Sequence, residues 1–322
     1  MKLSVETERF RLKRPFRISR GMRREACVLT VRIERDDDTG TGECVPYGRY
    51  GETVESVRDS ILSLVPPFDR TELDSLLPPG AARNALDCAL WDLEAKNSDL
   101  PVWKCAGLSP PKPLMTACTI SLGSPEEMYE ESATRADFPL LKVKLGPSSQ
   151  SSDQLAAVRD GAPDSRLIVD VNEGWDFEEL YRLASELVRF GVDMVEQPLP
   201  AGQDNQLAEE QFPFSICADE SCHTIDSLEV LPAGYDMINI KLDKTGGLTA
   251  ALKLKRQAQL LGYKIMVGSM MSSSLAIAPA ILVAQDIQIV DLDGPLMLSE
   301  DRNDPLHYCD GKVYPADQAL WG

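Results

Sequence analysis

Short apolar runs recur at near-regular intervals from residue 114 onward, and this recurrence constrains the fold more than any other feature of the chain. The runs are candidate β-strands, and they cover residues 114–121, 139–145, 166–171, 192–196, 214–218, 236–241, 264–268 and 287–291. Segments with helical patterning separate several of them, namely 125–136, 177–190, 224–231 and 247–261. Strands that alternate with helices are typical of a parallel α/β sheet, and eight such strands are what a (β/α) barrel needs. We therefore predict an α/β fold with a barrel over residues 113–293.

The first 112 residues follow another pattern. Strand-like alternation in 2–12 and 26–35 comes first, and helical patterning in 53–64 and 81–96 follows. Strands followed by helices are typical of an α+β unit. The proline-rich stretch 109–113 marks the boundary with the barrel. We therefore predict a separate N-terminal α+β domain over residues 1–112.

The charge balance and the apolar stretches exclude several classes of protein. The chain has 33 Lys and Arg against 51 Asp and Glu, a formal net charge of −18 without a basic cluster. This argues against a nucleic-acid partner and against an anionic membrane surface. The apolar stretch 276–284 is shorter than the roughly 20 residues of a membrane span, and the N-terminus lacks a signal-peptide pattern. The 8 cysteines form no CxxC pair, which indicates free thiols and a cytoplasmic protein.

Acidic residues end three consecutive apolar runs. They are Asp170, Glu196 and Asp219, and each lies about one strand–helix repeat from the next. Because the carboxyl ends of barrel strands meet at one rim, we expect these side chains to lie together. Three carboxylates without a counter-charge nearby in the sequence are costly unless a cation neutralises them. Oxygen ligands select a hard ion, so the pattern predicts an Mg²⁺ site.

Lysines end two other runs. Lys144 and Lys241 lie on strands four places apart in a ring of eight, so we expect them on opposite sides of the metal. Lys142 and Lys144 point to the same face of their strand, and a second ammonium group nearby should favour the neutral form that a base requires. Taken singly, an acid at a strand end usually caps a helix, and a lysine there is usually solvated. All of these acids and lysines lie at the same position of the strand–helix repeat, and this joint pattern favours a catalytic site.

Several segments resemble the muconate-lactonizing subgroup of the enolase superfamily over essentially the whole chain. These segments are LKVKL, DVN, EQPLP, CADES and NIKLDKTGG, and the DLDGP element is similar to that of the dipeptide epimerases within the subgroup. The resemblance implies a modified (β/α)7β TIM-type barrel with an N-terminal capping domain. It also implies that residues 294–322 return to that cap.

The resemblance assigns roles to the residues at the strand ends. It implies that Lys144 and Lys241 are the two acid/base groups, one on each face of an α-carbon, while the role of Lys244 stays open. It implies metal ligation by the three acids named above, with Mg²⁺ stabilising the enediolate that forms when the α-proton leaves. The expected reaction is a 1,1-proton transfer that inverts the C-terminal residue of a dipeptide. Murein peptide recycling is the pathway implied.

Other residues are expected to select the substrate. Asp291 and Asp293 share a face of the last strand and would receive the dipeptide ammonium group. Arg20 would bind an acidic side chain, with Arg23 and Arg24 as neighbouring candidates. Two further candidates for contact with the substrate are Thr119 and Lys142.

Two other interpretations stay open. The first is another reaction of the subgroup, such as N-acylamino acid racemisation, o-succinylbenzoate synthesis or cycloisomerisation. An anionic substrate without an ammonium group would be repelled by Asp291 and Asp293, and this distinguishes the two readings. The second is a barrel that has lost catalysis. The sequence is also compatible with a homo-oligomer.

Overall fold

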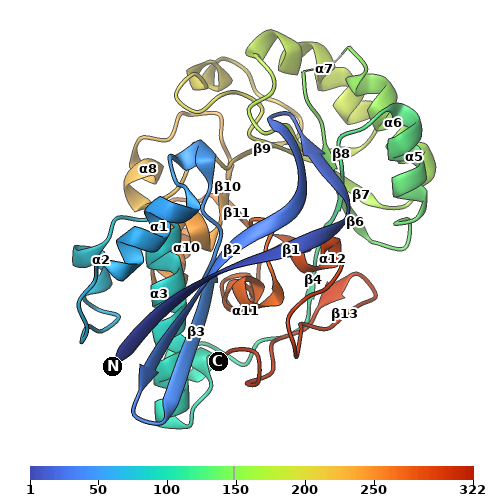
Figure 1. The fold of residues 1–322 in the computed structure, drawn as a ribbon. Coiled ribbons are helices and arrows are strands. Elements are labelled where there is room, and N and C mark those ends of the chain that lie inside the picture. Colours follow the sequence, from blue (N-terminus) through green and yellow to red (C-terminus); the bar gives the residue numbers. More distant parts are fainter. Residues whose placement is uncertain (148) are drawn as a thin grey trace.

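The N-terminal part of the chain forms an antiparallel meander that caps a barrel, as seen in a computed structural model that describes residues 1–147 and 149–322 (Figure 1). The meander pairs in the order β1 (Lys2–Ile18), β2 (Gly21–Arg35), β3 (Asp38–Cys44). Helix α3 (Ala81–Ser98) packs on β3, and a Cβ on Gly40 would lie 2.1 Å from the carbonyl oxygen of Ala89. Glycine is therefore required for this close approach. The other cap elements are the 3₁₀ helix η1 (Gly48–Tyr50), α1 (Val54–Leu62), α2 (Leu73–Leu76) and α4 (Val102–Cys105).

The second part is the predicted barrel. Within the described residues, eight parallel strands follow one another in chain order: β5 (Cys118–Ile120), β6 (Leu140–Lys144), β7 (Arg166–Asp170), β8 (Val192–Glu196), β9 (Ser215–Ala218), β10 (Met237–Ile240), β11 (Lys264–Gly268) and β12 (Ile289–Asp291). The amide of Ala117 donates to the carbonyl of Val290 at 2.7 Å, which links the first strand to the last. The prediction of an α/β barrel with an α+β cap is confirmed.

Helices cover the outside of the barrel, and the sequence predicts some of them better than others. The helices are α5 (Pro125–Ala133), α6 (Ser151–Gly161), α7 (Phe177–Arg189), α8 (Ile225–Glu229), α9 (Leu242–Thr245), α10 (Leu248–Leu260) and α11 (Ser274–Val283). Our patterning missed α11 because it is apolar on all sides and contains Pro279, so it has no polar face to give a period. Between β8 and β9 the described chain has only the 3₁₀ helix η2 (Asn205–Glu209) in place of an α-helix.

The first apolar run is divided between two sheets. Only its second half is a barrel strand, because β4 (Leu114–Met115) pairs with β14 (Lys312–Val313), which in turn pairs with β13 (Tyr308–Cys309). The run 114–121 was therefore too long as a single barrel strand. The short turn around Thr116 and Ala117 separates the halves, and Thr116 donates its amide to Gly311.

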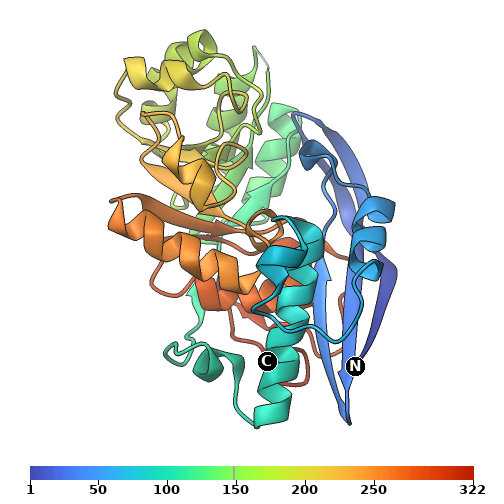
Figure 2. The same cartoon turned by 90° about the vertical axis from the view of Figure 1, so that its left-hand side faces the viewer.

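The C-terminal segment after the barrel includes α12 (Gly294–Met297) and contacts the cap. Arg302 donates to Glu8 and Glu43 at 2.9 and 2.6 Å, and the indole of Trp321 donates to the carbonyl of Cys88. Both termini lie at the same end of the molecule, and α3 lies between the cap sheet and the barrel (Figures 1 and 2). The cap is thus held on the barrel by the last residues of the chain. The division at residues 112 and 293 stays a prediction.

One layer of buried side chains fills the barrel at the end away from the site. The strands, or the residue just before them, contribute Ala117, Leu140, Ile168, Met194, Cys217, Met237, Met266 and Ile289. The carboxyl ends of the strands lie at the opposite end of the barrel, where they form the floor of a cavity. In the described part of the chain, no helix has the length and apolar character needed to cross a bilayer.

Candidate active site

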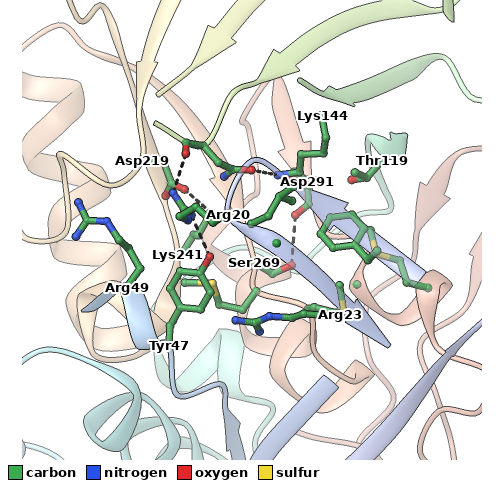
Figure 3. A pocket seen from close by; sticks show the side chains of 18 of the residues that line it. Arg20, Arg23, Tyr47, Arg49, Thr119, Lys144, Asp219, Lys241, Ser269 and Asp291 are labelled. Carbon is green, nitrogen blue, oxygen red and sulfur yellow. Dashed lines mark hydrogen bonds and ion pairs between the residues drawn. The ribbon is translucent and has the colours of Figure 1, made fainter. Parts of the chain in front are cut away.

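A cavity of about 430 Å³ lies between the carboxyl ends of the barrel strands and the loops of the cap. This volume suits a small molecule. The barrel lines it with Lys142, Lys144, Asp219, Lys241, Asp291 and Asp293, and the cap lines it with Phe16, Arg20, Arg23, Tyr47, Arg49 and Tyr50. Figure 3 shows Arg20, Tyr47 and Asp219 gathered on one side of the pocket, and Thr119 on the other.

The three acids predicted as metal ligands lie on adjacent strands. Asp170 ends β7 and is paired in register with Glu196 at the end of β8, while Asp219 follows β9 directly. All three are buried, with exposed fractions of 0%, 0% and 1%. The structure therefore brings these side chains together at one rim, as the spacing predicts.

The two lysines approach from strands four places apart. The Nζ of Lys144 lies 2.5 Å from Oδ2 of Asp170 and 3.2 Å from Oδ1 of Asn172. The Nζ of Lys241, at the end of β10, lies 2.6 Å from Oδ2 of Asp219. The two ammonium groups thus flank the carboxylates from opposite sides of the barrel. A molecule between them would present one face to each.

Lys142 lies among the carboxylates. Its Nζ is 3.0 Å from Asp170, 2.7 Å from Glu196 and 2.7 Å from Asp291. Burial alone would lower its pKa, but these carboxylates raise the pKa well above its ordinary value. The expectation that neighbouring lysines favour each other's neutral form fails for Lys142, because three carboxylates surround its ammonium group at 2.7–3.0 Å. For Lys241, burial also opposes the charged form, and Asp219 and Glu196 raise its pKa in the same way.

The three acids fit a hard divalent ion by their chemistry and their burial. Among the described residues, no three Asp, Glu, His or Cys side chains are arranged so that they already surround a metal position. Lys142 and Lys241 instead form ion pairs with these carboxylates. The Oε2 of Glu196 is buried, and it faces the ammonium group of Lys142 at 2.7 Å. Burial raises the pKa of Glu196, and nearby Asp170 adds to this effect. A buried set of carboxylate oxygens on adjacent strands suits Mg²⁺.

Neighbouring polar side chains hold these ligands, and the sequence analysis missed most of them. Lys244, whose role was open, donates to the side chain and carbonyl of Asp219 and to the carbonyls of Cys222 and Asn239, all at 2.6–2.8 Å. It therefore supports Asp219 from below the cavity. Asn239 donates to Glu196, which also fixes that carboxylate. Asn239 lies two residues before Lys241, a strand spacing that puts both on one face.

The two acids of the last strand lie at the far end of the cavity. Asp291 ends β12 and accepts from Lys142 through Oδ2, while its buried Oδ1 has no hydrogen-bond partner among the described residues. Asp293 accepts from the amide of Thr119 at 2.7 Å. Burial, with the charge of Asp291, raises the pKa of Asp293 to about 7. This pair would gain from a cationic group of a ligand.

The three arginines of the cap differ in what they contact. Arg20 lies in the turn between β1 and β2, and its side chain is 26% exposed. Its guanidinium lies 3.0 Å from Glu173 and 2.7 Å from Glu220, so two carboxylates already neutralise it. Arg23 lines the cavity and stacks on the ring of Tyr47 at 5.2 Å. No ion pair is found for Arg23 in the described chain, and Arg24 does not line the cavity.

Comparison with known proteins agrees with this geometry. Residues 1–107 match the N-terminal domain of mandelate racemase/muconate lactonizing enzymes, and residues 126–319 match the enolase C-terminal domain-like family. The chain belongs to the enolase superfamily. Like other members, it combines a cap with a barrel, and the two matches follow the two parts described above.

Individual relatives in the superfamily are similar over nearly their whole length. The chain is 44% identical to the L-Ala-D/L-Glu epimerase of Escherichia coli K12, over 97% of this chain and 99% of that protein. It is 42% identical to an N-acetyl-D-glutamate racemase of a Pseudoalteromonas species, over 92% and 95%.

Solved structures also match. An enolase family member from Agrobacterium tumefaciens, with bound sodium and L-Ala-L-Glu, is 48% identical over 99% of each chain with a TM-score of 0.97. A dipeptide epimerase from Methylococcus capsulatus, in complex with Mg and L-Arg-D-Lys, is 30% identical with a TM-score of 0.87, over 98% of this chain and 97% of that one.

Proposed function

We propose that this protein is an Mg²⁺-dependent dipeptide epimerase that interconverts L-Ala-D-Glu and L-Ala-L-Glu at the C-terminal residue. The observation that carries this proposal is the pair of lysines, Lys144 and Lys241, on opposite sides of a cavity whose far end holds two buried acids, Asp291 and Asp293. The similarity to the E. coli epimerase and to the L-Ala-L-Glu complex supports it.

The two lysines are proposed as the acid/base pair. One removes the α-proton from its face of the substrate, and the ammonium group opposite returns a proton to the other face. Inversion needs no redox cofactor, because each lysine handles one proton and the charge on the pair is conserved. The cap loop around Tyr47 covers the cavity, which keeps water from the exposed carbanion.

Asp170, Glu196 and Asp219 would hold Mg²⁺. When bound, this ion supplies a Lewis acid that stabilises negative charge on the substrate carboxylate. The bound Mg in the related M. capsulatus epimerase supports the choice of ion. Lys244 and Asn239 act only by fixing two of the ligands in place.

The ends of the cavity would select the dipeptide. Asp291 and Asp293 are proposed to receive the substrate ammonium group, with Thr119 and Lys142 orienting them. For the acidic side chain, Arg23 is a better candidate than Arg20, because Arg20 already pairs with Glu173 and Glu220.

A second candidate function is racemisation of N-acetylglutamate. The 42% identity to an N-acetyl-D-glutamate racemase favours it, and that substrate would use the same lysines and the same arginine. It has no ammonium group, however, so Asp291 and Asp293 would face a neutral amide. The burial of both acids favours the dipeptide, and so does the Oδ1 of Asp291, which has no hydrogen-bond partner among the described residues.

Turnover in deuterated water tests the two candidates directly. L-Ala-L-Glu and N-acetyl-L-glutamate are each incubated with enzyme and Mg²⁺, and mass spectrometry follows the gain of one mass unit at the α-carbon. We expect the dipeptide to exchange and epimerise with the higher kcat/KM. A higher kcat/KM for N-acetyl-L-glutamate would contradict the epimerase proposal. A cytoplasmic role in murein peptide recycling fits this substrate, and a homo-oligomer stays a prediction.

A further inference from the structure

The carboxylate of Glu173 joins the cap to the barrel. It lies in the loop after β7, and its side chain is only 8% exposed. Arg49 of η1 donates to both of its oxygens at 2.6 Å, Arg20 donates to one at 3.0 Å, and the amide of Ala201 donates to the other at 2.9 Å. The buried carboxylate of Glu173, itself in a barrel loop, thus contacts two segments of the cap and a second loop of the barrel.

The backbone at this point is held in an uncommon conformation. Asn172 and Glu173 have φ values of 49° and 66°, in the left-handed region that side chains other than glycine rarely adopt. Such a conformation persists where surrounding contacts determine it. The contacts here come partly from the cap, because Ser19 and Arg20 both donate to the carbonyl of Asn172, at 3.0 and 2.9 Å.

The same turn reaches one of the two lysines. The side-chain oxygen of Asn172 accepts a hydrogen bond from the Nζ of Lys144 at 3.2 Å, and the backbone amide of Asn172 donates to Asp170. The Nζ of Lys241 contacts Asp219 and lies 3.9 Å from Glu196, and its link to Glu173 is longer, through Asp219, Glu220 and Arg20. A change at Glu173 therefore reaches Lys144 through one intervening residue, whereas it reaches Lys241 only through three.

We propose that Glu173 is a positioning residue that couples closure of the cap to the alignment of Lys144. When Arg20 and Arg49 close on Glu173, the left-handed turn is fixed, and Asn172 holds the ammonium group of Lys144 toward the substrate. Without that pairing the turn relaxes, and Lys144 loses its hydrogen bond to Asn172 while it keeps its ion pair with Asp170. The inference rests on the proposed two-lysine reaction and predicts an effect on one face of the substrate.

The test compares α-proton exchange of the two diastereomers, L-Ala-L-Glu and L-Ala-D-Glu, in deuterated water. Lys144→Ala and Lys241→Ala first establish which diastereomer each lysine exchanges. Glu173→Gln keeps the shape of the side chain but removes its charge. We expect kcat for exchange on the Lys144 face to fall by about 10–100-fold, the usual effect of losing a group that orients an active-site residue, and to change by less than about threefold on the other face.

Two further variants complete the design. Arg49→Met removes the bidentate partner of Glu173 and should reproduce the selective loss of exchange on the Lys144 face. Arg49→Lys keeps the positive charge and should retain part of that exchange. Asp193→Asn is the matched control, because it removes an acid that pairs with Arg166 on the exposed barrel surface. This control variant should leave α-proton exchange unchanged on both faces of the substrate.

Equal losses on both faces, or unchanged exchange in Glu173→Gln and Arg49→Met, would overturn the inference. A wild-type enzyme that exchanged neither dipeptide would count against the proposed function instead. The same comparison would then use the two enantiomers of N-acetylglutamate, whose faces meet the same lysines. If Glu173→Gln fails to fold, Arg49→Met decides the question alone.

Discussion

Replacement of Arg23 by alanine should weaken turnover of L-Ala-L-Glu selectively. Arg23 lines the cavity, stacks on Tyr47 and forms no ion pair within the described chain. Its removal therefore leaves no buried carboxylate without a partner, and the measured loss comes from the contact with substrate. A hydrogen bond to a charged group contributes about 1.5–3 kcal/mol, and the low end applies because Arg23 is exposed. A loss of about 1.5–2 kcal/mol corresponds to a fall in kcat/KM of roughly 10–30-fold.

The comparison with Arg20→Ala makes this prediction specific. Removing Arg20 leaves the buried carboxylate of Glu220 without its ion pair, and burial already raises the pKa of Glu220 to about 7. Loss of one partner of a buried pair is strongly destabilising. We therefore expect Arg20→Ala to lower the Tm and to reduce turnover of every dipeptide alike.

The assay measures kcat/KM for L-Ala-L-Glu and L-Ala-L-Ala in both variants, with the Tm determined in parallel. Arg23→Ala should change L-Ala-L-Ala by less than about twofold, because alanine offers the guanidinium no charge. A uniform loss for both dipeptides in Arg23→Ala would refute the reasoning. A selective loss of turnover of L-Ala-L-Glu in Arg20→Ala, with the Tm unchanged, would show instead that Arg20 binds the acidic side chain of the substrate.

Three other predictions follow from the site. Chelation should abolish turnover and Mg²⁺ should restore it, and Glu196→Gln should lower kcat by several orders of magnitude; full activity in excess chelator would contradict the metal site. Lys144→Ala and Lys241→Ala should each stop epimerisation in both directions while leaving α-proton exchange of one diastereomer, measured by mass spectrometry; loss of both exchanges in both variants would contradict two one-face bases. Since burial and Asp291 raise the pKa of Asp293 to about 7 and only the ionised acid attracts an ammonium group, kcat/KM for L-Ala-L-Glu should rise as the pH rises through about 7. That rise should be absent in Asp293→Asn and with N-acetyl-L-glutamate as substrate.

The repeat of strand ends made much of this molecule predictable. Each barrel strand buries its side chains on both faces, so it is an apolar run, and the first polar residue after it lies at the carboxyl rim. For that reason the positions of Asp170, Glu196 and Asp219 follow from sequence spacing alone. The same logic places Lys144 and Lys241 on strands four apart.

Pairing between charges was less predictable, because it depends on distances across the barrel. The sequence shows three acids without a counter-charge nearby, yet Lys142 and Lys244 lie within 3 Å of members of this set. Lys244 sits three residues beyond Lys241, on the short helix α9, and this turn brings it back under Asp219. Strand spacing carries no signal for a contact made by a helix that begins where the strand ends.

The contribution of the cap was the least visible in the sequence. Arg20, Arg49 and Glu173 are far apart along the chain and lie in turns, where neither the strand nor the helix period applies. Their meeting depends on how the cap docks on the barrel, and Arg302 and Trp321 near the end of the chain contribute to this docking through their contacts with Glu43 and Cys88. A buried carboxylate such as Glu173 is costly without its partners. Its presence in a left-handed turn three residues after Asp170 is therefore explained only when the closed cap is taken as part of the active site.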